Sequence, residues 1–168
     1  YAGVIAYLAP YSLTRDAEWS VGVYFALYAG FAVVGRVGLG RIQDRFGDNV
    51  IAIPILLSFT LSLALIAVAS NGFVISVAGV FMGLGFGMVL PTMQAAASKV
   101  VQPVNMNSAV AAVYVSIDLG VGVAPFALGP IIGVVGFSGM YVLLALVVLL
   151  AAAIYLGGHG RTNGGAPG

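Results

Sequence analysis

Long apolar runs separated by short polar breaks make up most of this sequence. A helix of about 20 apolar residues crosses the hydrocarbon core of a bilayer. Four runs approach or reach that length: Trp19–Leu39, Val50–Ala69, Phe73–Thr92 and Met140–Leu156. A fifth, Ser108–Val135, is longer and contains two prolines, and a sixth, Tyr1–Leu13, is too short to span. The runs do not alternate apolar and polar residues as barrel strands do, so they predict five spanning helices and the end of one more.

The breaks between the runs carry turn and capping residues. They lie at 15–18, 71–72, 102–105 and 137–139. Asn71-Gly72 is a tight-turn signal, and Asn105 or Asn107 can cap the fifth span. After Gly157 the sequence is rich in glycine and reads as a disordered tail. We therefore expect a helical bundle over residues 1–157 and a cytoplasmic tail over 158–168.

Composition places this bundle in lipid. The chain is 61% hydrophobic and 7% charged, whereas a soluble domain has roughly 25% charged residues. No cysteine is present and His159 is the single histidine, which excludes thiolate and histidine metal sites. A net charge of +1 gives no support for nucleic-acid binding. No signal peptide, nucleotide-binding loop or Ser-His-Asp set is visible, so we expect a membrane protein that is not an enzyme and needs no cofactor.

Basic residues in the short breaks predict the orientation. They fall on one side of the predicted bundle: Arg36, Arg41, Arg45, Lys99 and Arg161. The opposite side has only Arg15, offset by Asp16 and Glu18. Because cytoplasmic loops carry an excess of lysine and arginine, the pattern predicts a cytoplasmic C-terminus in a multi-pass protein of a bacterial inner membrane.

Glycine is shared unevenly among the runs, and small residues mark helix faces that approach closely. Gly79, Gly83 and Gly87 recur every fourth residue and predict one such face. The runs Val50–Ala69 and Met140–Leu156 lack glycine and are expected to face lipid. Two packed helices followed by a peripheral one, twice over, suggest two three-helix repeats, an arrangement typical of secondary transporters. The alternative is that glycine is simply common in membrane helices.

Three motifs carry a family resemblance. Gly40-x-x-x-Asp44-Arg45-x-Gly47, preceded by Gly35-Arg36, resembles the loop signature of the major facilitator superfamily, although Asp48-Asn49 replaces its final basic pair. The segment 120–129, with Pro125 and Gly129, resembles a pattern of proton-coupled efflux members, and 83–92 resembles the tenth helix. The resemblance implies an all-α six-helix half, helices seven (partial) to twelve. Its partner would be the N-terminal half, absent here, or a second copy.

The resemblance also implies a conformational latch at the loop signature. The residues concerned are Gly35, Arg36, Gly40, Arg41, Asp44, Arg45 and Gly47. Asp44 would meet a helix N-terminus of the other half, whose partial positive charge favours an anion. Arg36 and Arg45 would hold that contact in one state. The alternative is that these residues are ordinary cytoplasmic anchors.

Asp118 is the only ionisable residue well inside a predicted span. A carboxylate at this depth needs a partner or a water-filled cavity. Since Tyr114, Asp118, Gly122 and Pro125 share one helix face, we expect Asp118 to face the protein interior. It is either a proton carrier or a packing residue bonded to a neighbouring helix.

Further residues are candidates for a substrate cavity or for helix packing. The cavity candidates are Tyr24, Tyr28, Met88, Thr92, Gln94 and Tyr114. Helix packing or bending is expected at Gly79, Gly83, Gly87, Pro91, Gly122, Pro125 and Gly129. Together with the resemblance, they lead us to expect a proton-coupled antiporter that exports a small molecule. The alternative is a non-transporting membrane subunit or scaffold that binds a partner through glycine-rich helix faces.

Overall fold

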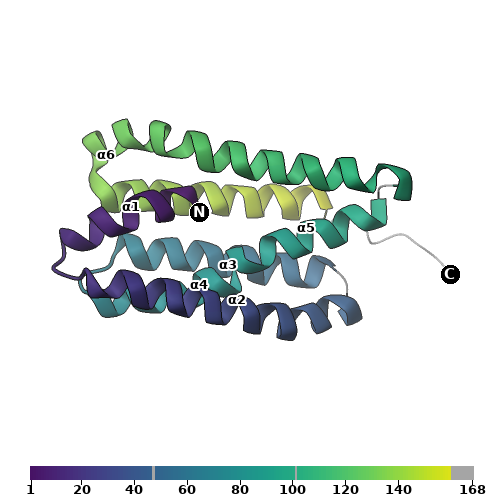
Figure 1. Ribbon diagram of the computed structural model, residues 1–168, viewed down its shortest axis with the longest axis horizontal. Coiled ribbons are helices and arrows are strands. Elements are labelled where there is room, and N and C mark those ends of the chain that lie inside the picture. Colours follow the sequence, from purple (N-terminus) through teal and green to yellow (C-terminus); the bar gives the residue numbers. More distant parts are fainter. Residues whose placement is uncertain (47, 101, 160–168) are drawn as a thin grey trace.

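A computed structural model describes residues 1–46, 48–100 and 102–159, and over these ranges the fold is all-α (Figure 1). Its elements are α1 (Ala2–Leu13), α2 (Trp19–Phe46), α3 (Asp48–Ala67), α4 (Gly72–Leu84), α5 (Phe86–Val100), a 3₁₀ turn (Pro103–Asn105) and α6 (Met106–His159). The helices run side by side along the long axis of the molecule. The all-helical prediction is therefore confirmed.

Helix α6 folds back on itself at Gly136 and so contains the last two predicted spans. Gly136 has φ 70° and ψ 177°, a conformation that favours glycine. Figure 1 shows the two parts of α6 running antiparallel, with the reversal at the end of the bundle where α1 ends. We call residues 106–135 the first limb and residues 137–159 the second limb. The break predicted at 137–139 is thus one residue late, and the helix continues through Pro125 and Pro130.

The predicted span Phe73–Thr92 is divided at Gly85 rather than at Pro91. Gly85 has φ −81° and ψ −88°, and α5 starts at the next residue. The division occurs where the chain presses on α3, because a Cβ at Gly85 would lie 2.5 Å from the backbone nitrogen of Phe59. Pro91 sits inside α5 without ending it. The segments long and apolar enough to cross a membrane, within the described ranges, are Trp19–Gly38, Gly72–Gln94 and Met106–Tyr155, and the last contains both limbs.

Several helices run further than the hydropathy pattern predicts. Helix α2 continues from Leu39 to Phe46, so the expected loop carrying the charged cluster is helical. Arginine and glutamine are good helix formers, and Arg45 in the last turn complements the helix dipole. Helix α6 ends at His159, two residues beyond the expected end of the bundle. The rest of the predicted tail lies outside the described residues.

The closest packing in the bundle is between α2 and the α4–α5 segment. A Cβ added at Gly83 would lie 2.5 Å from the Tyr28 carbonyl oxygen, and one at Gly87 would lie 2.7 Å from Ala32 Cβ. One at Gly79 would overlap the carbonyl oxygen of Tyr24. The three glycines are four residues apart, and so are the residues of α2 that they contact. The glycines therefore let the backbone of α2 approach closely along two helical turns.

Helix α3 lies in the core, contrary to the expectation that it faces lipid. Phe59, Leu63 and Ile66 are buried, and Ser62 Oγ donates to the Ala78 carbonyl oxygen at 2.8 Å. Large apolar side chains fill this interface, so the absence of glycine does not mark a peripheral helix. The second limb carries a row of exposed apolar residues, Val142, Leu143, Leu146, Val147 and Leu150, as a lipid-facing helix does.

Candidate functional site

Asp118 lies on the exposed side of the first limb, not toward the interior of this chain. The side facing the bundle carries Ile117, Ala124 and Leu128, and adjacent helical residues are rotated by about 100°. Asp118 is also near the middle of the limb, 12 residues after Met106 and 18 before Gly136. A carboxylate facing lipid at that depth costs roughly 3 kcal/mol. This face is therefore suited to water or protein rather than to acyl chains.

A second polar feature lies beside Asp118. Gln94 Nε2 on α5 donates to Tyr114 Oη on the first limb at 3.3 Å, and the pair is exposed. Tyr114 is one turn before Asp118 on the same limb, and its side chain is 44% exposed. We call Gln94, Tyr114 and Asp118 the polar strip. The structure thus brings two of the cavity candidates together with the candidate proton carrier.

The other cavity candidates lie elsewhere. Tyr24 and Met88 are buried in the core, where Met88 packs against Ile51 and Ile55 of α3. Tyr28 is half-buried, with its ring centroid 5.8 Å from that of Tyr1. The sequence pattern grouped these residues by polarity and spacing, which do not tell which helix covers them.

Thr92 lines an apolar cavity of about 290 Å³ between α3, α5 and the second limb. Its Oγ1 is buried and meets no hydrogen-bond partner among the described residues. The remaining lining is almost entirely apolar, with Ile55, Val89 and Ala151 contributing from the three helices.

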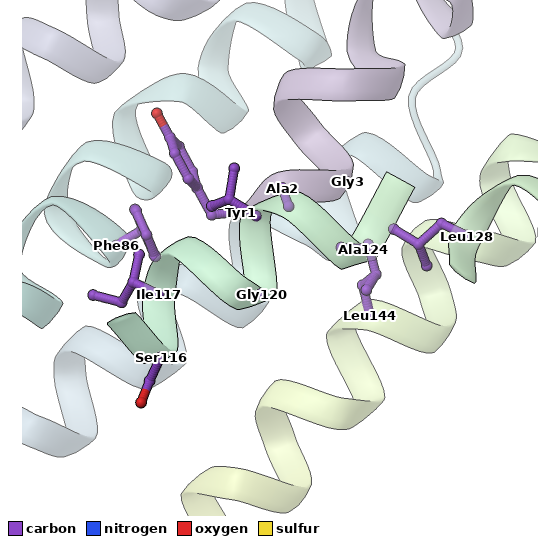
Figure 2. A pocket seen from close by; sticks show the side chains of 11 residues that line it. Tyr1, Ala2, Gly3, Phe86, Ser116, Ile117, Gly120, Ala124, Leu128 and Leu144 are labelled. Carbon is purple, nitrogen blue, oxygen red and sulfur yellow. The ribbon is translucent and has the colours of Figure 1, made fainter. Parts of the chain in front are cut away.

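A second cavity, of about 240 Å³, lies where the starts of α1 and α5 meet the first limb (Figure 2). The rings of Tyr1 and Phe86 stack at its edge, with centroids 4.0 Å apart and planes 10° from parallel. Ser116 of the first limb contributes a hydroxyl group to the cavity lining. Its Oγ donates to the Ala112 carbonyl oxygen at 2.8 Å. None of the sequence candidates lines this cavity. The cavity depends on the stacking of Tyr1 and Phe86, which are far apart in the sequence. No local sequence pattern predicts such a contact.

The charged cluster occupies the last turns of α2. Arg36 and Arg45 are exposed there, while Gly35 is buried against Met88, whose Cγ would lie 3.3 Å from a Cβ at that glycine. Apart from its own helix, no described atom lies within 4 Å of a Cβ placed at Gly40. Gly47 and the side chains of Arg41 and Asp44 fall outside the described residues. The proposed contact of Asp44 with another helix therefore stays a prediction.

The glycines and proline predicted to pack on the first limb divide into two groups. Pro125 and Gly129 face α1, because Tyr7 Oη donates to the Pro125 carbonyl oxygen at 2.6 Å and lies 3.4 Å from a Cβ built at Gly129. Gly122 has open space around its Cβ position, so it packs on none of the described residues of other helices. Gly122 is one helical turn after Asp118 and therefore lies on the same exposed face of the first limb.

Comparisons with known proteins agree with the motifs and the fold. The family model described as Major Facilitator Superfamily matches residues 2–167. An uncharacterized MFS-type transporter of Pseudomonas aeruginosa strain UCBPP-PA14 is 25% identical over 168 residues, which cover 97% of this chain and 40% of that protein. No solved structure matches. With its apolar helices and this match along almost its whole length, the chain is an integral membrane protein and belongs to the Major Facilitator Superfamily.

Proposed function

We propose that the complete protein is a secondary active transporter that moves a small solute by alternating access, and that this chain supplies its C-terminal six-helix half. The observation that carries the proposal is the exposed polar strip in the middle of apolar spans. A surface of this kind is unfavourable against lipid, so it fits the wall of a water-filled pathway. The family supports transport rather than catalysis.

The partner that completes the pathway is proposed to be the other half of the same protein. Open space surrounds the Cβ positions of Gly30 and Gly38 on α2 and of Gly120 and Gly122 on the first limb. Such positions let another helix approach closely. The chain spans 40% of its Pseudomonas relative, which leaves ample length for further helices in that protein. A second copy of this chain is the alternative partner.

Proton coupling is assigned to Asp118 within this proposal. Its carboxylate takes up a proton while it faces water, and the neutral form passes through the dry intermediate at lower cost than the charged form. Export in exchange for protons rests on the resemblance of residues 120–129 to proton-coupled efflux members. The cytoplasmic placement of the C-terminus rests on the basic residues, and it is supported by Figure 1, where α2, α5 and α6 end on the same side of the bundle.

The test is solute-driven proton flux in proteoliposomes that contain the complete protein. A panel of compounds is applied to the wild type, to Asp118→Asn and to Asp16→Asn. Asp16 is a matched control because it lies in an exposed turn with φ 50°, a conformation that asparagine also adopts. We expect coupled flux in the wild type and in Asp16→Asn, and loss of it in Asp118→Asn.

Two other outcomes decide against parts of the proposal. Equal coupled flux in Asp118→Asn and in the wild type would remove the proton-carrier role from Asp118. Absence of flux for every compound in the wild type would contradict transport. The open glycine faces would then favour a non-transporting subunit that binds a partner helix.

A further inference from the structure

Tyr11 joins three separate parts of the bundle at the end where α1 finishes and α6 reverses, which we call the outer end. Its side chain is 1% exposed. Tyr11 Oη lies 3.0 Å from the Ile66 carbonyl oxygen, 3.3 Å from that of Ala69, and 3.3 Å from Ser138 Oγ. Ile66 lies in the last turn of α3, Ala69 follows the end of that helix by two residues, and Ser138 follows the reversal of α6. One phenol from α1 therefore contacts both α3 and α6.

The hydrogen bonds at Tyr11 run in one direction. The phenol has a single proton, which it donates to the α3 carbonyls, so Tyr11 Oη accepts from the Ser138 hydroxyl. Ser138 Oγ in turn accepts from Arg15 Nη2 at 3.4 Å. The Arg15 guanidinium also lies over the Tyr11 ring, 5.4 Å from its centroid. Each group donates to the next, from Arg15 at the exposed end to the α3 carbonyl oxygen at the buried end.

A second phenol on the same face of α1 repeats the attachment one turn deeper. Tyr7 Oη donates to the Pro125 carbonyl oxygen of the first limb at 2.6 Å. Pro10 lies between the two tyrosines, and a proline removes a backbone hydrogen bond and leaves a helix easy to bend. The two phenols hold α1 on both sides of this weak point. We call Tyr7, Tyr11, Arg15 and Ser138 the outer latch.

We propose that the outer latch makes the outer ends of α1, α3 and α6 one rigid unit, so that α1 does not bend at Pro10 when the protein changes state. Tyr11 is the positioning residue of the unit, since it alone reaches both α3 and α6. That the protein changes state rests on the transport proposed above. The latch itself rests on the hydrogen bonds.

The test is a distance distribution between spin labels on the complete protein, in which the only cysteines are the two introduced for labelling. This chain contributes no cysteine of its own. Leu13→Cys and Val134→Cys place the labels at exposed sites on α1 and on the first limb, 57% and 86% exposed respectively. The pair is measured at acidic and at neutral pH, with Tyr11→Phe, Ser138→Ala and Tyr24→Phe added in turn. Tyr24→Phe is the matched control, because Tyr24 is fully buried while its Oη meets no hydrogen-bond partner among the described residues.

We expect a single narrow distance, unchanged by pH, in the parent pair and in Tyr24→Phe. Tyr11→Phe and Ser138→Ala are expected to broaden it or to add a second distance. A distribution as narrow in both variants as in the parent, or a parent distance that changes with pH, would overturn the latch. The width of the distance distribution and its response to pH are both measured without a substrate. Absence of flux in proteoliposomes would therefore contradict the proposed transport without deciding whether the outer latch exists.

Discussion

Replacing Gly83 by alanine tests the packing of α4 on α2 most sharply. The new Cβ would lie 2.5 Å from the Tyr28 carbonyl oxygen and 2.9 Å from the Ala32 nitrogen, both backbone atoms that cannot rotate away. Because Cβ atoms essentially never approach within 3.0 Å, the two helices must separate by about 0.5 Å or more. Overpacking of this kind costs about 1–3 kcal/mol, which exceeds the gain of up to about 1 kcal/mol from replacing glycine in a helix.

The matched control is Gly22→Ala, in the first turn of α2. Among the described residues, no atom outside the glycine's own turn of helix lies within 4 Å of the Cβ position of Gly22, so the same methyl group enters open space. Gly22→Ala should leave stability unchanged or raise it slightly, while Gly83→Ala lowers it. A difference of about 2 kcal/mol between the two variants corresponds to roughly 30-fold in the unfolding equilibrium.

The assay is reversible unfolding of the complete protein from mild detergent into SDS, followed by loss of helical circular dichroism. The midpoint for Gly83→Ala should fall clearly below those for the wild type and Gly22→Ala. If Gly83→Ala unfolds at the wild-type midpoint, the close approach of the two backbones described above is not present in the protein.

Two further substitutions test local geometry by the same unfolding assay. Gly136→Ala forces a Cβ into φ 70° and should destabilise by about 1–3 kcal/mol, whereas Gly133→Ala, with open space at its Cβ, should not; equal midpoints would refute the reversal at Gly136. Asn71→Ala removes the side chain that accepts from the Val74 backbone N–H at 3.1 Å and caps α4, so it should cost about 0.5–2 kcal/mol, while the neighbouring Ser70→Ala stays neutral; no loss in Asn71→Ala would show that the cap is not formed.

Hydropathy and turn residues were sufficient to predict the order of the helical segments along the described part of the chain. The break between the last two spans was predicted within one residue of Gly136, and Asn71 caps α4 at the tight turn indicated by Asn71-Gly72. The ends of the helices were less predictable. Charged residues end an apolar run without ending a helix, so α2 continues through the basic cluster to Phe46.

The candidate site was only partly predictable, because a single sequence gives helix faces without their neighbours. The glycines at every fourth residue, Gly79, Gly83 and Gly87, indicated a close helix contact. The structure places α2 against them. The sequence likewise showed a polar residue at Asp118, but it did not show whether the side chain faces the interior of this chain or its exposed surface. Glycine spacing at Gly122 looks the same whether the face meets a helix of this chain or open space. The stacked pair of Tyr1 and Phe86 arises from tertiary structure alone.

The central claim is that the polar strip faces water inside the membrane, and the accessibility of position 118 tests it most directly. A single cysteine is introduced as Asp118→Cys or as Ile154→Cys in a complete protein without other cysteines. Both positions are 18 residues from Gly136 and therefore at similar depth, and Ile154 is 66% exposed on the second limb, which we expect to face lipid. We predict that a membrane-impermeant thiol reagent labels position 118 and not position 154. Failure to label position 118 from either side of the membrane would contradict a water-filled pathway at Asp118.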